Sequence, residues 1–260
     1  MRANYHTHTW LCRHAVGTPT DYAQAALACG MKVLGMSDHA PFEELRDRSI
    51  RMFPEELPTY LRECDEAIAA YAGRLKILKG LEIEYFEGRD DFYAGLRKQL
   101  DYLALGQHYV DFSQNLTGLR SVYRLSGTDE LEVYAKTLVK AMSTGFFQFV
   151  CHPDLMLFGS SGFDEETKRH SVAIIEAAKK YDVPLEINAN GIRRGTFRFP
   201  EGTRYVYPRW EFWKLVKEIG ARVIISADAH HPDLLADEAI GEAQRFARSL
   251  GLEVEEELQF

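Results

Sequence analysis

Seven short apolar segments alternate with longer helical patterns along almost the whole chain, and this alternation restricts the fold more than any other feature. The segments predict strands at residues 3–6, 32–37, 75–83, 102–106, 147–151, 184–188 and 222–227. The helical patterns cover residues 20–29, 54–71, 91–99, 129–144, 164–181, 208–219 and 234–250. Strands that each precede a helix form a parallel sheet. Because 260 residues contain no linker and no repeat, we expect one α/β domain, residues 1–260, built on a closed or nearly closed barrel.

Composition excludes several classes of protein. A net charge of −8 argues against a protein that coats nucleic acid or binds anionic membranes by bulk attraction, although bound metal cations would still admit a small anionic substrate. No apolar run reaches membrane-spanning length, and the early first strand leaves no room for a signal peptide. The four cysteines form no Cys-x-x-Cys pair, so we expect reduced thiols in a cytoplasmic protein.

Residues that could bind metal gather at the ends of the predicted strands. His6 and His8 are two residues apart, so both side chains lie on one face of the first strand. Later strand ends carry Asp38 and His39, Glu82 and Glu84, His108, His152 and Asp154, and Asp228 and His230, while His14 follows the first strand. Seven of the nine histidines therefore lie at or just after strand ends, where parallel barrels hold their active sites. Because imidazole is the commonest metal ligand among side chains, the pattern predicts a metal centre.

These motifs, in this order, resemble the complete set of the PHP (polymerase and histidinol phosphatase) family. They are His6-x-His8, His14, Ser37-Asp38-His39, Gly80-x-Glu82, His108, His152-Pro153-Asp154 and Ser226-x-Asp228-x-His230. The resemblance runs from Tyr5 to about Pro232, and the stretches at residues 12–15, 186–191 and 228–230 are similar to the histidinol-phosphatase branch. It implies a distorted seven-stranded (β/α)7 TIM-like barrel with two to three divalent metal ions.

The family resemblance also implies how the ligands are shared. His6, His8, Glu82 and Asp228 would hold one ion, and Glu82, His108 and His152 a second, with Glu82 bridging the two. His14, His39 and His230 would hold a third. Three ions need roughly twelve to fifteen ligand positions, so these nine residues would leave room for water and substrate oxygens. Zinc, iron and manganese all suit such donors.

The expected activity is a metal-dependent phosphomonoesterase that hydrolyses L-histidinol phosphate in histidine biosynthesis. A hydroxide bridging two ions would attack phosphorus, with Glu82, Asp228 and His230 as the catalytic residues. Asp228, His230 or a metal-bound water could protonate the leaving oxygen. One alternative is a PHP-family phosphoesterase acting on another small phosphomonoester or on a nucleotide or nucleic-acid end. Another is a metal-binding module without activity.

Substrate contacts are expected from the loop after the sixth strand, which carries Asn190, Arg193 and Arg194. Guanidinium groups bind phosphate bidentately, so either arginine could hold the phosphoryl group. Weaker candidates are Arg120, Arg124 and Arg209, and the imidazole and amine of the substrate could meet Trp10, Phe42, Glu43 or Glu84. The insertion between the second and third strands would suit a lid.

Further residues are given structural roles. Asp38 points away from His39 by strand alternation and is expected to support a ligand. Cys12 is expected to be a buried loop residue, and Cys151 to face the helical layer. His170 and His231 are expected at the surface, and Trp210 and Trp213 in the core. Residues 253–257 are expected to form a solvated tail or a short edge strand.

Overall fold

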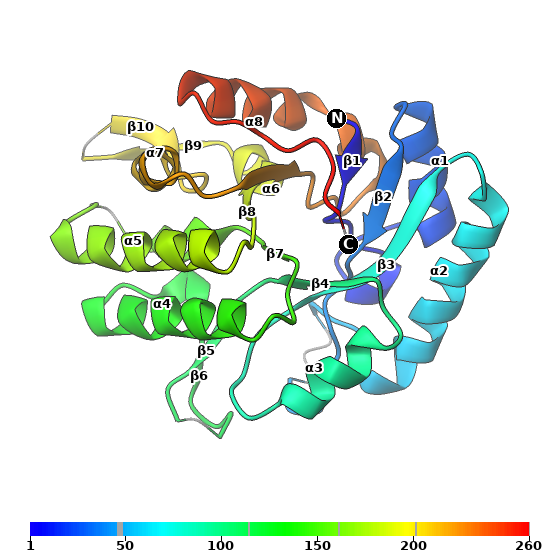
Figure 1. The fold of residues 1–260 in the computed structure, drawn as a ribbon, viewed down its shortest axis with the longest axis horizontal. Coiled ribbons are helices and arrows are strands. Elements are labelled where there is room, and N and C mark those ends of the chain that lie inside the picture. The colour runs from blue at the N-terminus through cyan, green and yellow to red at the C-terminus, as the bar shows by residue number, and fades with distance from the viewer. Residues whose placement is uncertain (46–48, 114, 161, 201, 260) are drawn as a thin grey trace.

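The barrel is built from seven parallel strands. The computed structural model of the chain describes residues 1–45, 49–113, 115–160, 162–200 and 202–259. Its main sheet has the strand order β1-β2-β3-β4-β7-β8-β11. Its two edges meet where Thr7 and Ala229 form a parallel bridge, with His8 N donating to Ala229 O at 2.9 Å. The sheet is therefore the nearly closed barrel that the sequence predicted, with helices packed around it (Figure 1).

All seven predicted strands are confirmed, each shorter than expected at one or both ends. They are β1 Ala3–Asn4, β2 Val33–Met36, β3 Lys76–Ile83, β4 Tyr102–Leu105, β7 Phe149–Val150, β8 Leu185–Asn188 and β11 Val223–Ser226. Most are buried at every position, as strands covered on both faces must be.

The seven predicted helices are also present. The α-helices of the described residues are α1 Pro19–Ala28, α2 Leu57–Tyr71, α3 Asp90–Arg97, α4 Thr128–Ser143, α5 Glu165–Lys180, α6 Ala189–Arg193, α7 Trp210–Ile219 and α8 Glu238–Ser249. Thr18 caps α1 through a capping box with Asp21. The last predicted helix is divided, because Asp237 is extended between the 3₁₀ turn Pro232–Ala236 and α8.

Three short elements were not predicted. They are α6 and two antiparallel hairpins, β5 Tyr109–Asp111 with β6 Leu119–Ser121, and β9 Thr196–Phe199 with β10 Gly202–Tyr205. The hairpin strands have three or four residues each, and β9 and β10 are mostly exposed. Such segments lack the buried alternation from which strands are recognised in a sequence.

The interior of the barrel is filled by a separate set of side chains centred on Tyr102. The Tyr102 hydroxyl donates to the carbonyl oxygens of Tyr5 and Met36, at 2.7 and 2.9 Å. A Cβ atom at Gly80 would lie 2.3 Å from the Tyr102 ring, and one at Gly35 would lie 2.3 Å from its hydroxyl oxygen. Glycine at both positions is therefore what admits this ring.

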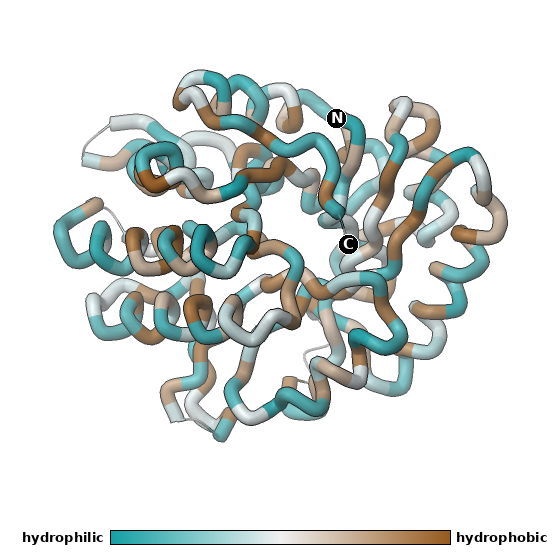
Figure 2. Tube along the Cα trace, in the orientation of Figure 1, coloured by the Kyte–Doolittle hydropathy of each residue, from teal (hydrophilic) through white to brown (hydrophobic). Residues whose placement is uncertain are grey.

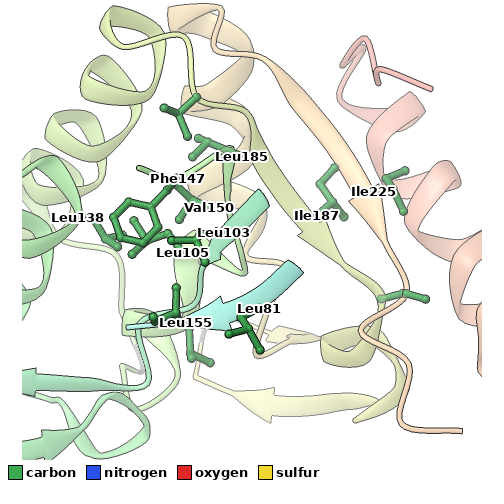
Figure 3. Close-up of a cluster of buried hydrophobic side chains, with 14 of the residues drawn as sticks. Leu81, Leu103, Leu105, Leu138, Phe147, Val150, Leu155, Leu185, Ile187 and Ile225 are labelled. Carbon is green, nitrogen blue, oxygen red and sulfur yellow. The ribbon is translucent and has the colours of Figure 1, made fainter. Parts of the chain in front are cut away.

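The larger apolar layer lies between the sheet and the helices. Figure 3 shows part of it, where Leu81 and Leu103 of the strands pack among side chains that include Leu138 of α4. Along the outer helices hydrophilic and hydrophobic stretches alternate, as expected for helices that bury one face (Figure 2). Trp213 of α7 is fully buried as predicted, but the prediction for Trp210 was wrong: 45% of its surface is exposed.

His170 was also predicted wrongly. It lies on α5, and only 5% of its surface is exposed because α4 packs beside α5 and covers it. His231 is partly exposed, and its Nδ1 accepts a hydrogen bond from Asp233 N, in agreement with a surface role.

The acidic C-terminal segment closes the bottom of the barrel and is not a solvated tail. Figure 1 shows it running from the end of α8 to the centre of the barrel. Glu255 N donates to Val223 O, and the Glu255 carboxylate binds the Arg222 guanidinium. Leu258, only 4% exposed, joins the interior side chains, and its N–H donates to the Tyr5 hydroxyl at 2.8 Å. The predicted edge strand is absent as well, since residues 253–257 form no described strand.

None of the described helices is both long enough and apolar enough to cross a membrane.

Candidate metal centre

Four buried side chains meet at the carboxyl end of the barrel. His6 Nε2 and His8 Nε2 each lie 3.2–3.6 Å from Glu82 Oε2 and from Asp228 Oδ1. These four atoms have no hydrogen-bond partner within the described part of the chain and almost no contact with solvent. A tetrahedral ion with bonds of about 2.0–2.1 Å holds its ligand atoms about 3.3–3.4 Å apart. The donor set and its spacing therefore fit a divalent metal ion.

The second oxygen of Glu82 faces a different pair of histidines. Glu82 Oε1 lies 2.9 Å from His152 Nε2 and 3.5 Å from His108 Nε2. All three side chains are buried or nearly so. One carboxylate thus stands between two groups of donors, which is the arrangement required to hold two ions close together.

The remaining predicted ligands lie on the outer side of this centre. His14 Nε2 and His230 Nε2 are 2.8 Å apart, and the His14 ring lies 5.5 Å from the ring of His39. His39 also reaches inward, with its Nδ1 3.0 Å from Glu82 Oε2. Donor atoms of His8, His39 and His230 lie within 4.8 Å of one another. The structure thus gathers all nine predicted ligands and leaves His39 between the outer pair and the bridging carboxylate.

Two of the predicted ligands have a left-handed backbone, which residues other than glycine seldom adopt. The φ angle is 31° at His152 and 45° at Asp228. Such conformations occur where a functional side chain must be aimed. At His152 the turn breaks the strand alternation, and this explains why the prediction for Cys151 was wrong. Cys151 faces the barrel interior, with donor atoms of His6 and Glu82 within 4.8 Å of its sulfur.

Several of the predicted ligands lie beside buried carboxylates that do not belong to the predicted ligand set. Glu186 Oε1 lies 2.8 Å from His6 Nδ1, and Glu84 Oε1 lies 3.4 Å from His108 Nδ1. Asp38 accepts hydrogen bonds from Thr9 and lies 3.6 Å from His8 Nδ1, as expected of a supporting residue. Cys12 is fully buried in a 3₁₀ turn beside it, as predicted.

Glu186 is the residue for which the sequence analysis gave no role. The sequence did contain a signal for this role, namely a carboxylate inside the apolar strand β8. A carboxylate in a strand that is buried on both faces needs a hydrogen-bonding partner.

The electrostatics of the centre keep both carboxylates charged. Burial alone would raise the pKa of Glu82 and of Asp228, but the surrounding histidines hold both pKa values well below their usual range. Burial, aided by the neighbouring His8, lowers the pKa of His230 to about 3. Its imidazole is therefore neutral at pH 7, as a metal ligand must be.

A cavity of about 470 Å³ opens above the centre. It is lined by His14, His39, Ile50, Glu82, His108, Tyr109, Ser121, Tyr123, His152, Asn190, Arg194, Asp228 and His230. The insertion expected to act as a lid contributes Ile50, and its residues 46–48 lie outside the described chain. The cavity therefore joins the metal-binding side chains to a mixed polar and aromatic wall.

The structure separates the two arginines predicted to bind phosphate. Arg194 lines the cavity, and its guanidinium carbon lies 5.6 Å from the centre of the Tyr123 ring and 6.0 Å from that of Tyr207. Arg193 does not line it, because its guanidinium binds Asp237 and the carbonyl oxygens of Ala227 and Leu234. Asn190 does line it, and its Nδ2 donates to Asp228 Oδ2 at 3.2 Å.

The weaker candidates are not part of the cavity wall. Arg120 pairs with Glu130, Arg209 is buried and pairs with Glu211, and Arg124 is exposed. Trp10 Nε1 donates to Glu63, Phe42 packs in the core, and Glu43 is exposed. Glu84 is occupied by Arg51.

Comparison with known proteins agrees with this geometry. A relative from Deinococcus radiodurans, named a probable histidinol-phosphatase, is 28% identical over 236 residues, which cover 87% of this chain and 85% of the relative. A relative of the same name from Schizosaccharomyces pombe is 25% identical over 254 residues, covering 89% and 81%. A probable phosphatase from a Thermoanaerobacter species is 24% identical over 235 residues, covering 86% and 77%.

A solved structure shares the fold. The histidinol phosphate phosphatase of Lactococcus lactis, determined with zinc, L-histidinol and phosphate, matches with a TM-score of 0.72 at 17% identity, covering 97% of this chain and 95% of that one. A sequence model of the family described as the PHP domain matches residues 4–190, well over half of the chain. The chain therefore belongs to the PHP domain family.

Proposed function

We propose that this protein is a metal-dependent phosphomonoesterase whose substrate is L-histidinol phosphate. The observation that carries the proposal is the position of Glu82, with one oxygen facing His6 and His8 and the other facing His108 and His152, at the base of a cavity that also holds Arg194. Two adjacent cation positions beside a guanidinium group are suited to a dianionic phosphate ester.

The first ion would be held by His6, His8, Glu82 and Asp228, and the second by Glu82, His108 and His152. His14, His39 and His230 would hold a third. When bound, such ions lower the pKa of coordinated water and neutralise charge on the phosphoryl oxygens. Zinc, iron and manganese all accept imidazole and carboxylate ligands, so the donor set admits each of them.

The chain itself positions the ester. Arg194 is exposed at the cavity wall, where its guanidinium lies over the rings of Tyr123, Phe158 and Tyr207, and in the proposal this planar group binds two phosphoryl oxygens. Asn190 fixes Asp228 through its side-chain amide and stands at the same wall. Asp228 and His230 both border the cavity, and in the proposal either of them would relay a proton from a metal-bound water to the leaving oxygen.

The choice of L-histidinol phosphate is supported by the relatives. Two curated relatives carry the name histidinol-phosphatase, and the structural neighbour from Lactococcus lactis was determined with L-histidinol and phosphate. Another small phosphomonoester is the alternative that needs a direct test.

The test is a turnover assay on protein stripped with a chelator and reloaded separately with Zn²⁺, Mn²⁺ or Fe²⁺. Histidinol phosphate is compared with a panel of small phosphomonoesters and an oligonucleotide with a terminal phosphate. We expect the highest kcat/KM for histidinol phosphate. Good turnover of another panel member with none of histidinol phosphate would refute the substrate, and no metal-dependent turnover of any member would refute the enzyme class.

A further inference from the structure

Glu186 is a fully buried carboxylate that contacts ligands on both sides of the predicted dinuclear centre. Its Oε1 lies 2.8 Å from His6 Nδ1, and its Oε2 accepts the His152 N–H at 3.0 Å. His6 belongs to the first set of donors and His152 to the second. We propose that Glu186 is a positioning residue that couples the two metal positions, so that filling one favours filling the other. The inference rests on the proposed metal centre but not on the substrate.

The contact with His6 determines which ring nitrogen is free. When Glu186 accepts a hydrogen bond from Nδ1–H, the lone pair of the imidazole is at Nε2. His6 Nε2 is the atom that faces Glu82 and Asp228 and has no hydrogen-bond partner in the described structure. Glu186 therefore prepares His6 as a donor and fixes the plane of its ring.

The contact with His152 acts on the backbone. Strands β7 and β8 pair at Val150 and Leu185, and Val150 N donates to Pro184 O. In a regular parallel ladder the next bond on this side would run from His152 N to the main chain of β8. The Glu186 side chain accepts that N–H instead. It thereby stabilises the left-handed turn that aims the His152 ring at Glu82 Oε1.

A third contact extends the network to Asp228. Asn188 Nδ2 donates both to Glu186 Oε2, at 2.8 Å, and to Asp228 Oδ2, at 3.1 Å. The outward oxygen of Asp228 is thus held while its Oδ1 faces His6 and His8. A shift of Glu186 would consequently disturb ligands of both ions, and an ion that orders one set would order the other through the same carboxylate.

Asp38 offers a matched comparison. It is also a fully buried carboxylate, but the ligand near it is His8, which belongs to the first position alone. Loss of a supporting carboxylate typically lowers metal affinity about 10–100-fold. We expect Glu186→Gln to lower the affinity of both positions by that factor, because the Gln amide cannot serve as acceptor for both His6 and His152. Asp38→Asn should weaken the first position only.

The experiment is a titration of chelator-treated full-length protein with Mn²⁺, followed by calorimetry and by electron paramagnetic resonance. Two ions that share Glu82 are spin-coupled, so the coupled signal reports joint occupancy. Wild-type protein should give this signal at low loading, and Glu186→Gln should give isolated Mn²⁺ first. Circular dichroism without metal checks the fold, and Glu186→Asp, which keeps the charge on a shorter side chain, gives a second test.

The inference would be overturned if Glu186→Gln bound Mn²⁺ as a coupled pair, as wild type does. It would also be overturned if the variant lowered the metal affinity of one position alone. These readouts do not depend on turnover. A wild-type protein that binds Mn²⁺ as a coupled pair but hydrolyses no phosphomonoester would contradict the proposed function and leave the role of Glu186 intact.

Discussion

Arg51 and Glu84 form a fully buried ion pair, with guanidinium nitrogens 3.1 and 2.7 Å from the two carboxylate oxygens. Arg51 comes from the insertion after β2, and Glu84 directly follows β3. The pair therefore ties the insertion to the barrel next to His108, which Glu84 also contacts. Arg51 also donates to Ala40 O at 3.0 Å, so this one guanidinium satisfies acceptors in two segments.

Removing the carboxylate should destabilise the protein strongly. Glu84→Gln leaves the Arg51 charge buried without a counterion, which typically costs about 3–5 kcal/mol. The free energy of unfolding, measured with urea on metal-free protein, tests this. A double variant with Met at 51 and Leu at 84 serves as control, because apolar replacement of both partners is usually better tolerated. Equal stability of Glu84→Gln and wild type would contradict the prediction.

The same pair predicts a pH dependence. Burial alone would raise the pKa of Glu84, but the charge of Arg51 dominates and lowers it to about 2. The charged carboxylate thus stabilises the fold at pH values above the pKa that Glu84 has in the unfolded chain. This stabilisation is lost as the pH falls toward 2. The difference in unfolding free energy between wild type and Glu84→Gln should be constant from pH 7 to 5 and shrink below about pH 4.5. A difference that grows on acidification would contradict this sign.

Arg194 and Arg193 should behave differently when each is replaced by alanine. Arg194→Ala removes the cation of the cavity and should lower kcat/KM by about 10²-fold, with weaker inhibition by inorganic phosphate. Arg193→Ala breaks contacts with Asp237 and the barrel backbone, so it should lower the melting temperature while changing kcat/KM only a few-fold. Steady-state kinetics and thermal melting of both variants decide between these roles. The opposite ranking of kcat/KM would show that the phosphate contact is assigned to the wrong arginine.

His8 should be needed for metal and turnover together. His8→Ala removes a donor from the tetrad and should weaken metal binding by at least about 10²-fold, as measured by elemental analysis after dialysis. Turnover should fall in parallel while circular dichroism stays that of a folded barrel. His231→Ala removes a partly exposed histidine one residue from His230 and should leave metal content unchanged. In wild type, chelation should abolish turnover and added metal should restore it. Turnover of His8→Ala at the wild-type level would contradict the site.

The C-terminal segment should contribute to stability despite its charge. Leu258→Ala removes a side chain buried beneath Tyr5 and Tyr102 and should cost about 2 kcal/mol or more in urea unfolding. Leu258→Met, which conserves volume, should cost less than about 1.5 kcal/mol. If both variants unfold like wild type, the segment does not close the barrel in solution.

The sequence predicted the seven strands because each is an apolar run with a ligand or glycine near its end, and it predicted the nine donor residues because barrel topology brings strand ends together. It could not decide the direction of individual side chains. Strand alternation predicted that Cys151 faces the helical layer. Because the backbone is left-handed at His152, Cys151 instead faces the barrel interior. Adjacent residues such as Arg193 and Arg194 are indistinguishable until their neighbours are known.

The prediction for the C-terminal segment was wrong for a related reason. Residues 253–257 contain four glutamates, and this charge predicts exposure to solvent. Arg222 and Arg2 pair with two of these glutamates, so the segment can lie across the barrel. Whether Trp210 is exposed and His170 is buried likewise depends on which helices lie beside α7 and α5, and helical periodicity does not contain that information.

The Tyr102 ring and its apolar neighbours fill the barrel below the metal-binding side chains, and residues such as Phe149 and Leu258 there are almost fully buried. In the part of the chain that the structure describes, small molecules therefore reach the centre through the cavity lined by Tyr123 and Arg194. In the proposed reaction, the ester, the alcohol and the phosphate would therefore all pass through this one opening.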